Sequence, residues 1–339
     1  MTLSEVESVT GEVGDFQVQV IQRPRYVKLD KCIACGECAK KCPKKVPDEY
    51  NRGQNQRKSI YIKYAQAVPL KYVIDPDSCI YIQKGRCGAC EKVCPADAID
   101  FSDAAKQVSL NVGAIILATG FETVDPARRD ALGYCRHPNV LTSMEFERIL
   151  SSSGPTQGHV VRPSDHKAPQ KIAWVQCVGS RSAREDELRP YCSTMCCTQA
   201  IKEAGLAKDH VPGLDAAVFY IDIRTMGKYF ERYYYRAQKS GVRFIKSRVS
   251  SLHPEPGSDR LLIDYTDNGN HRREEFDLVV LSVGMMPSAH NVELTKKFGL
   301  TLNEEGFPVT NSLNPVESSR PGILLCGAIE APKDIPTSV

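Results

Sequence analysis

Eight cysteines in the first hundred residues lie in two runs whose spacing suits iron–sulfur chemistry. The first run reads C-x2-C-x2-C-x3-C-P, and the second repeats its last three cysteines and its proline, with the first cysteine set back by seven residues. Four soft thiolates, three from one tight loop and one from elsewhere, are the ligand set of a four-iron cluster. The first run holds Cys32, Cys35, Cys38 and Cys42, and the second holds Cys79, Cys87, Cys90 and Cys94.

This spacing is that of bacterial ferredoxins, in which the fourth cysteine of each run ligates the other cluster. We therefore predict one cluster on Cys32, Cys35, Cys38 and Cys94, and a second on Cys79, Cys87, Cys90 and Cys42. Structural zinc sites are the alternative, but they take paired C-x2-C units, whereas each run here supplies three cysteines and then a fourth before proline. A disulfide framework is disfavoured because nothing in the sequence indicates secretion.

Four further cysteines form a second constellation, which consists of Cys177, Cys192, Cys196 and Cys197. Cys177 stands where a dinucleotide-binding unit would carry the glycines that cradle a phosphate, and only Gly179 remains of that pattern. We therefore predict no NAD(P)H binding there. Buried structural cysteines are the alternative, but C-x3-C-C beside a strand-end cysteine favours a third cluster. Of the two cysteines left over, we expect Cys135 in a loop and Cys326 buried in a strand.

The composition limits the classes of protein to consider. A chain of 339 residues with 42% hydrophobic content can form two or three domains with their own cores. The net charge of +3 gives no argument for nucleic acid, and no run of apolar residues is long enough to span a membrane. No secretory signal opens the chain, so the cysteine-rich sequence indicates a reducing, cytoplasmic location. The lysines around the first run form either a solvated face or a docking surface for an acidic electron-transfer partner. They are Lys31, Lys40, Lys41, Lys44 and Lys45.

Hydrophobic periodicity and turn residues predict the elements that must position these cysteines. Strands are expected at 16–21, 112–120, 171–177, 216–223, 242–245, 260–265 and 276–283, and helices at 143–150, 198–207, 225–240 and 292–298. Asp267-Asn268-Gly269 is typical of a hairpin turn, and 151–169 reads as a hinge. The aromatic residues within 229–235 indicate core packing, with a redox role as the alternative.

Together these features resemble the A subunit of heterodisulfide reductase and its relatives. The resemblance rests on the paired cysteine runs and on the segments WVQCVGSR, YCSTMCC, FYIDIR and APKDIP. It implies an α/β, thioredoxin-reductase-like flavoprotein fold with two dinucleotide-binding-type domains and an inserted α+β ferredoxin domain. It also implies a third four-iron cluster on Cys177, Cys192, Cys196 and Cys197, and a flavin adenine dinucleotide (FAD) site. The retained flavin contacts expected from it are Thr119, Gly120, Gly327, Lys333, Asp334 and Ile335.

The same resemblance divides the chain into parts. The expected parts are 1–24, a remnant of the flavin domain; 25–105, the two-cluster ferredoxin domain; 106–150, the return segment of the flavin domain; 151–290, a second Rossmann-like domain with the third cluster; and 291–339, a C-terminal flavin-domain segment. The family places a G-x-G-x-x-G unit ahead of residue 1, so we expect a partial chain that holds only part of the flavin site. The alternatives are that the missing half is a separate chain, or that this member has lost its flavin.

Two functions are compatible with these expectations. In the first, the chain is an oxidoreductase subunit that relays electrons between a hydrogenase, formate dehydrogenase or ferredoxin side and a partner that reduces a disulfide, quinone or thioester, with flavin-based bifurcation in some relatives. Its expected partners are B- and C-like subunits and a hydrogenase or formate dehydrogenase linker, with a homodimer inside the complex as a further option. In the second, the chain only wires clusters together and holds no flavin.

Overall fold

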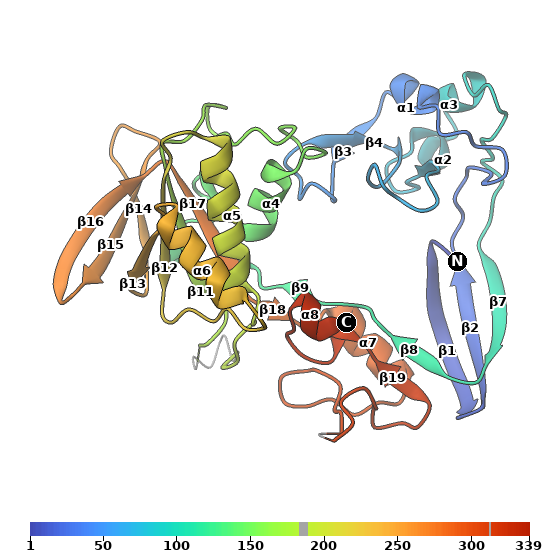
Figure 1. Ribbon diagram of the computed structural model, residues 1–339. Coiled ribbons are helices and arrows are strands. Elements are labelled where there is room, and N and C mark those ends of the chain that lie inside the picture. The colour runs from blue at the N-terminus through green and yellow to red at the C-terminus, as the bar shows by residue number, and fades with distance from the viewer. Residues whose placement is uncertain (183–188, 312) are drawn as a thin grey trace. The chain divides into compact units, whose positions relative to one another are not determined.

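The computed structural model describes residues 1–182, 189–311 and 313–339 (Figure 1), which form two compact units. Unit 1 comprises residues 1–11 and 15–112, and unit 2 comprises 12–14 and 113–339. Within these described residues, no helix combines the length and the apolar character needed to cross a bilayer.

Unit 1 contains a three-stranded sheet in the order β1-β2-β7 and a cysteine-rich segment between two of its strands. The strands are β1 (Ser4–Glu12), β2 (Asp15–Gln22) and β7 (Lys106–Val112), and β2 pairs with β7 in antiparallel register from Phe16↔Val112 to Gln22↔Lys106. Alternate residues of β2 are buried, as the sequence pattern predicts for a strand with one covered face. Pairing of strands so far apart in sequence brings the two ends of segment 23–105 together.

Segment 23–105 consists of short elements around a small core. They are α1 (Glu37–Lys41), β3 (Lys45–Pro47), β4 (Gln56–Lys58), β5 (Ile60–Tyr61), β6 (Val73–Ile74), α2 (Ile80–Lys84) and α3 (Ala89–Lys92). The core contains Ile60, Ile74 and Ile99 together with Cys32, Cys38 and Cys79. With so few apolar side chains, the interior of this segment is built largely from the cysteines themselves.

The centre of unit 2 is a five-stranded parallel sheet in the order β10-β17-β11-β12-β13. Its strands are β10 (Val140–Thr142), β17 (Leu278–Val283), β11 (Lys171–Val178), β12 (Asp215–Tyr220) and β13 (Arg243–Lys246). Buried on both faces, the central strands read as nearly continuous apolar runs, which is the pattern expected for parallel sheets.

Each face of this sheet packs against a different layer (Figure 1). Ile172 and Trp174 of β11 point to helices α4 (Ser143–Leu150), α5 (Cys196–His210) and α6 (Phe230–Lys239). Ala173 and Val175 point to the antiparallel sheet of β14 (Leu252–Pro254), β15 (Leu261–Asp267) and β16 (Asn270–Phe276). The period-two alternation of a strand therefore divides the core of unit 2 into two layers.

The remainder of unit 2 is built from short pairs. β8 (Ile115–Leu117) pairs in parallel with β19 (Ile323–Leu325), and β9 (Glu122–Thr123) pairs antiparallel with β18 (Met285–Met286). The helices here are η1 (Pro126–Arg128), η2 (Asp130–Leu132), α7 (Ala289–Lys297), η3 (Gly327–Ile329) and α8 (Ile335–Ser338).

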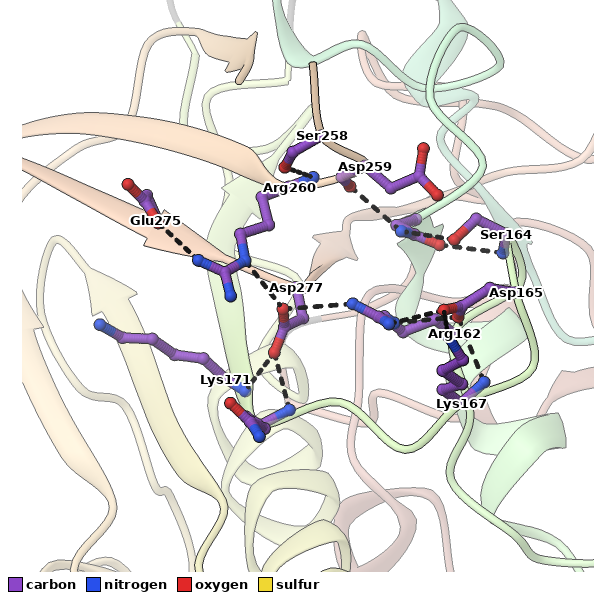
Figure 2. A network of polar contacts seen from close by, with 12 residues as sticks. Arg162, Ser164, Asp165, Lys167, Lys171, Ser258, Asp259, Arg260, Glu275 and Asp277 are labelled. Carbon is purple, nitrogen blue, oxygen red and sulfur yellow. Dashed lines mark hydrogen bonds and ion pairs between the residues drawn. The ribbon is translucent and has the colours of Figure 1, made fainter. Parts of the chain in front are cut away.

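Segment 151–169, which we expected to be a hinge, is anchored to the central sheet by charged groups. Figure 2 shows Asp277, which precedes β17, facing Arg162 and Arg260. The Asp277 carboxylate accepts hydrogen bonds from the backbone N–H of Gln170 (2.7 Å) and Lys171 (3.0 Å) and from Arg162 Nη1 (3.3 Å). Because Asp277 is only 6% exposed, these donors replace water around a buried charge.

Several predicted elements need correction. Segment 112–120 is not a buried strand, since only Ile115–Leu117 is extended and Ile116 is 67% exposed. The strand expected at 216–223 ends at Tyr220, and the helix expected from 225 begins only at Phe230, because Gly227 and Tyr229 adopt left-handed backbone conformations that interrupt a helix. Cys326 is exposed rather than buried.

Other predicted elements are confirmed. Helix α4 spans the predicted 143–150, and its Thr142–Glu145 capping box satisfies backbone donors at its start. The hairpin at 267–270 has Asn268 and Gly269 in left-handed conformations, as a two-residue turn requires. The strand β16 that follows was not predicted, because its polar sequence carries no apolar alternation.

Candidate functional site

The eight cysteines of unit 1 line two separate cavities. Cys42, Cys79, Cys87 and Cys90 line one, and Cys32, Cys35, Cys38 and Cys94 line the other. Each cavity therefore takes three cysteines from one run and the fourth from the other. This is the crossed grouping expected from the spacing, and the assignment of these residues as ligands remains a prediction.

Small residues and left-handed turns shape the walls of these cavities. Ala34 and Gly36 lie in the wall of one, and Gly88 and Ala89 in the wall of the other. Ala34, Gly36, Cys87 and Gly88 have positive φ angles, which curl the chain tightly around the cavities. A Cβ on Gly36 would lie 3.3 Å from the Tyr72 hydroxyl, so the loop has little spare room.

Burial disfavours the thiolate form of the cysteines in these cavities. Burial raises the pKa of Cys38 to about 12 and that of Cys90 to about 11, and the neighbouring cysteines add to both effects. A thiol that coordinates a metal is nevertheless deprotonated, because the metal supplies the compensating charge. The cavities therefore suit a group that brings positive charge and binds four thiolates.

Two lysines that the spacing did not identify contact the backbone of the cysteine runs. Lys71 donates to the carbonyl of Cys32, and Lys58 donates to the carbonyl of Cys42. Both lie on the connecting segment between the runs, where a lysine carries no recognisable sequence signal. They place positive charge beside each cavity, where a cluster bound by four thiolates would carry negative charge.

The second cysteine constellation lies at the carboxyl edge of the parallel sheet of unit 2. Cys177 is near the end of β11, and Cys196 and Cys197 form the first turn of α5, a 15-residue helix. The Cys196 Sγ lies 3.5 Å from the carbonyl oxygen of Val283, at the end of β17, and Thr194 N–H approaches the Cys192 Sγ at 3.4 Å. Ligands of open α/β sheets bind at this edge, next to helix N-termini.

These four cysteines influence one another's pKa values. Burial raises the pKa of Cys196, and the charges of Cys177, Cys197 and Cys192 raise it further. Burial likewise raises the pKa of Cys197 to about 11. The structure therefore brings all four together, as the spacing of C-x3-C-C indicated, and their role as ligands stays a prediction.

Backbone strain is concentrated around Cys177. This residue has a φ of 60°, unusual for a non-glycine residue, at a shift in strand register between Val175 and Val178. Gly179 has a φ of 74°, and a Cβ there would lie 2.4 Å from Val124 Cγ1. The bend turns Cys177 out of the strand path, and strain of this kind is found at functional sites.

Arg181 and Asp222 lie next to this constellation, and the spacing of the cysteines did not predict a role for them. Arg181 belongs to the segment WVQCVGSR and Asp222 to FYIDIR. Arg181 forms an ion pair with Asp222, and Asp222 also accepts from Arg224 Nε at 3.2 Å. Burial raises the pKa of the Cys177 thiol, and the Arg181 guanidinium beside it opposes that shift. The Cys197 Sγ lies 3.8 Å from the backbone carbonyl oxygen of Asp222.

Part of the expected flavin site is assembled by the β8–β19 pair. Thr119 and Gly120 follow β8, and Gly327 follows β19, so these residues lie at the carboxyl ends of two parallel strands. Asn291 Nδ2 donates to the Gly120 carbonyl at 2.8 Å, while the buried Asn291 Oδ1 has no hydrogen-bond partner among the residues that the structure describes. An orphaned buried acceptor and open space at Gly120 fit a bound group with a donor.

The remaining flavin candidates lie farther along the chain. Lys333 is paired with Glu330, Asp334 caps α8 through the N–H of Thr337 at 2.9 Å, and Ile335 is 80% exposed. Among the described residues, no three His, Cys, Asp or Glu side chains are placed to hold a single metal ion. A four-iron cluster needs a different arrangement of ligands, because each of its iron atoms takes one thiolate.

Comparisons with known proteins agree with the cysteine pattern. Residues 31–98 match the family described as 4Fe-4S dicluster domain. The whole chain aligns with the iron–sulfur A subunit of the CoB–CoM heterodisulfide reductase of Methanocaldococcus jannaschii, at 42% identity over 344 residues, which is 51% of that protein. It also aligns with the iron–sulfur A 2 subunit of the Methanopyrus kandleri reductase, at 44% identity over 343 residues and again 51% of the relative.

A third relative is the A subunit of the H(2)/formate:CoB-CoM heterodisulfide,ferredoxin reductase of Methanococcus maripaludis, 40% identical over 344 residues, all of this chain and 51% of that protein. Among solved structures, T. acidophilum thioredoxin reductase is 14% identical, with a TM-score of 0.41 over 68% of this chain and 62% of that one. A TM-score this low leaves the thioredoxin-reductase-like fold a prediction. The chain spans about half the length of the curated relatives it matches. Over its whole length, the chain is thus homologous to the A subunits of heterodisulfide reductases, and the family resemblance of its motifs is confirmed.

Proposed function

We propose that this chain is an electron-relaying, iron–sulfur part of a heterodisulfide-reductase-like oxidoreductase complex. The names of its relatives supply the two ends of the relay: hydrogen, formate or ferredoxin on one side and the CoB–CoM heterodisulfide on the other. The expected neighbours are B- and C-like subunits and a hydrogenase or formate dehydrogenase linker. The same proposal includes flavin-based electron bifurcation, in which a bound flavin would send one electron to each of two acceptors.

The two cavities of unit 1 carry the proposal. Cys32, Cys35, Cys38 and Cys94 are assigned to one four-iron cluster, and Cys79, Cys87, Cys90 and Cys42 to the other. Support comes from the two cavities lined by these sets and from the 4Fe-4S dicluster family match. Bound clusters supply one-electron redox chemistry. The thiolates would hold them, and the surrounding isoleucines would limit the access of water.

A third cluster on Cys177, Cys192, Cys196 and Cys197 is supported by their convergence at the carboxyl edge of the parallel sheet. The first turn of α5 places the positive end of a helix dipole next to these thiolates. Arg181 adds a positive charge next to Cys177. In this proposal the cluster occupies the space where a nucleotide would bind in a dinucleotide-binding domain, so the chain does not bind NAD(P)H there.

FAD is assigned to Thr119, Gly120, Gly327, Lys333, Asp334 and Ile335. The assignment is supported by the β8–β19 pair, which gathers Thr119, Gly120 and Gly327 at one edge, and by the unpartnered Asn291 Oδ1 beside Gly120. FAD would accept and release electron pairs there. The residues of this chain would position it through backbone groups at the strand ends. A relay without flavin is the alternative.

Anaerobic iron and acid-labile sulfide analysis tests the cluster count. Three clusters predict about twelve iron atoms per chain, four for each cluster. Cys177→Ser should reduce this by about four, and Cys135→Ser, at an exposed cysteine outside the three groups, should leave it unchanged. About eight iron atoms in the unsubstituted protein would exclude the third cluster. Acid treatment of the purified complex distinguishes the two functions. Released flavin would support a flavin-containing subunit, and its absence would support a relay without flavin.

A further inference from the structure

Segment 224–239, which follows β12 and includes α6, has an excess of basic over acidic residues. It contains five basic residues and one acidic residue, a net charge of +4 (5 − 1), whereas the whole chain carries +3 (44 − 41). The rest of the chain therefore sums to −1. We define the α6 patch as eight exposed residues of this segment with a net charge of +3 (4 − 1): Met226, Lys228, Tyr229, Glu231, Arg232, Tyr235, Arg236 and Lys239.

The aromatic residues of this segment divide between the core and the surface. Tyr233 and Tyr234 pack against the core, and the Tyr234 ring makes an edge contact with Phe244 at 4.6 Å between centroids. Tyr229 and Tyr235 do not, and they are 59% and 51% exposed. Core packing thus explains half of the tyrosines that the sequence groups together. Exposed tyrosines among arginines are the residue types that dominate protein–protein interfaces.

Tyr229 adopts a backbone conformation that its side chain disfavours. Its φ is 74° at the start of α6, where it makes no side-chain capping bond. Its ring lies between two cations, 5.1 Å from Lys228 Nζ and 4.9 Å from Arg232 Cζ, measured to the centroid. Strained residues held by their surroundings are found at ligand and partner sites, and here the strain presents an aromatic ring to solvent.

The α6 patch follows in sequence a short segment that contacts the second cysteine constellation. The chain runs from Asp222, whose backbone carbonyl lies 3.8 Å from the Cys197 Sγ, through Arg224 to the patch. Arg224 Nε donates to the Asp222 carboxylate at 3.2 Å, and Arg181, next to Cys177, pairs with the same carboxylate. Asp222 and Arg224 therefore link the start of the segment that carries the patch to Cys197 and to Arg181.

We propose that the α6 patch docks an acidic electron-transfer protein that exchanges electrons with the third cluster. In each encounter one electron leaves the carrier, which is oxidised, and enters the cluster, which is reduced, and no covalent bond changes. The electron-transfer part rests on the proposed third cluster, whereas the docking part rests only on the patch. Charge complementarity selects the partner, because a surface of net +3 attracts carboxylates and speeds their encounter.

The test compares two triple charge reversals in the full chain loaded with its clusters. The patch variant is Lys228→Glu, Arg232→Glu and Arg236→Glu, and the control is Arg248→Glu, Arg272→Glu and Lys296→Glu, at three other exposed bases. The probe is a small acidic two-iron ferredoxin, used both native and with its surface carboxylates amidated. Binding is measured by calorimetry and cluster reduction by stopped-flow and paramagnetic resonance, at low and high ionic strength.

At low salt we expect the patch variant to lose tenfold or more in affinity and in the second-order rate of reduction, while the control changes less than threefold. High salt and amidation should both remove this difference, because both weaken exposed charge pairs. Equal loss in the two variants, or no saturable binding of the native ferredoxin, would overturn the docking. A patch variant that only changes the oligomeric state would overturn it in favour of a second copy. Ferredoxin that binds at the patch in a protein with about eight iron atoms per chain would support docking and refute the third cluster.

Discussion

Glu203 is a buried carboxylic acid on the helix that carries Cys196 and Cys197. It is fully buried, accepts a hydrogen bond from Trp174 Nε1 at 2.9 Å and another from Gln199 Nε2 at 3.0 Å. Burial raises its pKa well above the usual range, and the nearby Glu147 raises it further, while these hydrogen bonds and Lys202 act in the opposite direction. The folded protein therefore favours the neutral form of Glu203 more than the unfolded chain does.

This protonation makes the stability of unit 2 depend on pH. An unfolded glutamic acid loses its proton near pH 4.3. Above that pH and below the raised folded pKa, the folded state binds one more proton than the unfolded state, so the free energy of unfolding falls as pH rises. The slope is about 1.4 kcal/mol per pH unit wherever the two states differ by one bound proton.

Glu203→Gln should remove this slope, because an amide keeps the shape and does not titrate. Trp174 is the only tryptophan in the chain, so its fluorescence reports guanidinium unfolding at this site. Subtracting wild type from the variant at each pH cancels the pH dependence of groups that both share. We expect the stability advantage of the variant to grow with pH, while the exposed Glu293→Gln shows a flat difference. A flat difference for Glu203→Gln would refute a neutral buried acid.

Three further predictions follow from the described contacts. Cys42→Ser and Cys94→Ser should each remove the cluster whose other three cysteines lie in the opposite run, and resonance spectra coupling Cys42 to its own run would contradict the crossed assignment. Gly179→Ala should lower the melting temperature more than Gly257→Ala, since both have positive φ but only the former would place its Cβ 2.4 Å from a valine methyl; equal losses would contradict this. Asp277→Asn should cost about 1.5–3 kcal/mol in denaturant unfolding, because buried donors lose a charged acceptor, and a loss below about 0.5 kcal/mol would contradict the network.

The cysteine spacing by itself determined a large part of this protein's chemistry. A four-iron cluster needs three thiolates on one short loop, so the requirement is local and is written directly into the sequence. The grouping of Cys42 with the second run could likewise be predicted, because a repeated motif implies a pseudo-symmetric pair. Strong apolar runs such as 171–178 and 278–283 predicted the parallel strands for a similar reason, since burial on both faces leaves an unmistakable pattern.

The tertiary structure alone decided which side chains surround those motifs. Arg181 and Asp222 are 41 positions apart, yet they form an ion pair next to Cys177, and no local pattern predicts a contact at that separation. The tyrosines of 229–235 look alike in sequence, but they differ in the structure. Tyr229 has a left-handed backbone conformation at the start of α6 and is exposed, whereas Tyr234 packs against the core. Cys326 is exposed, although its apolar neighbours suggested burial, because burial depends on which segments pack against a strand rather than on the strand's own composition.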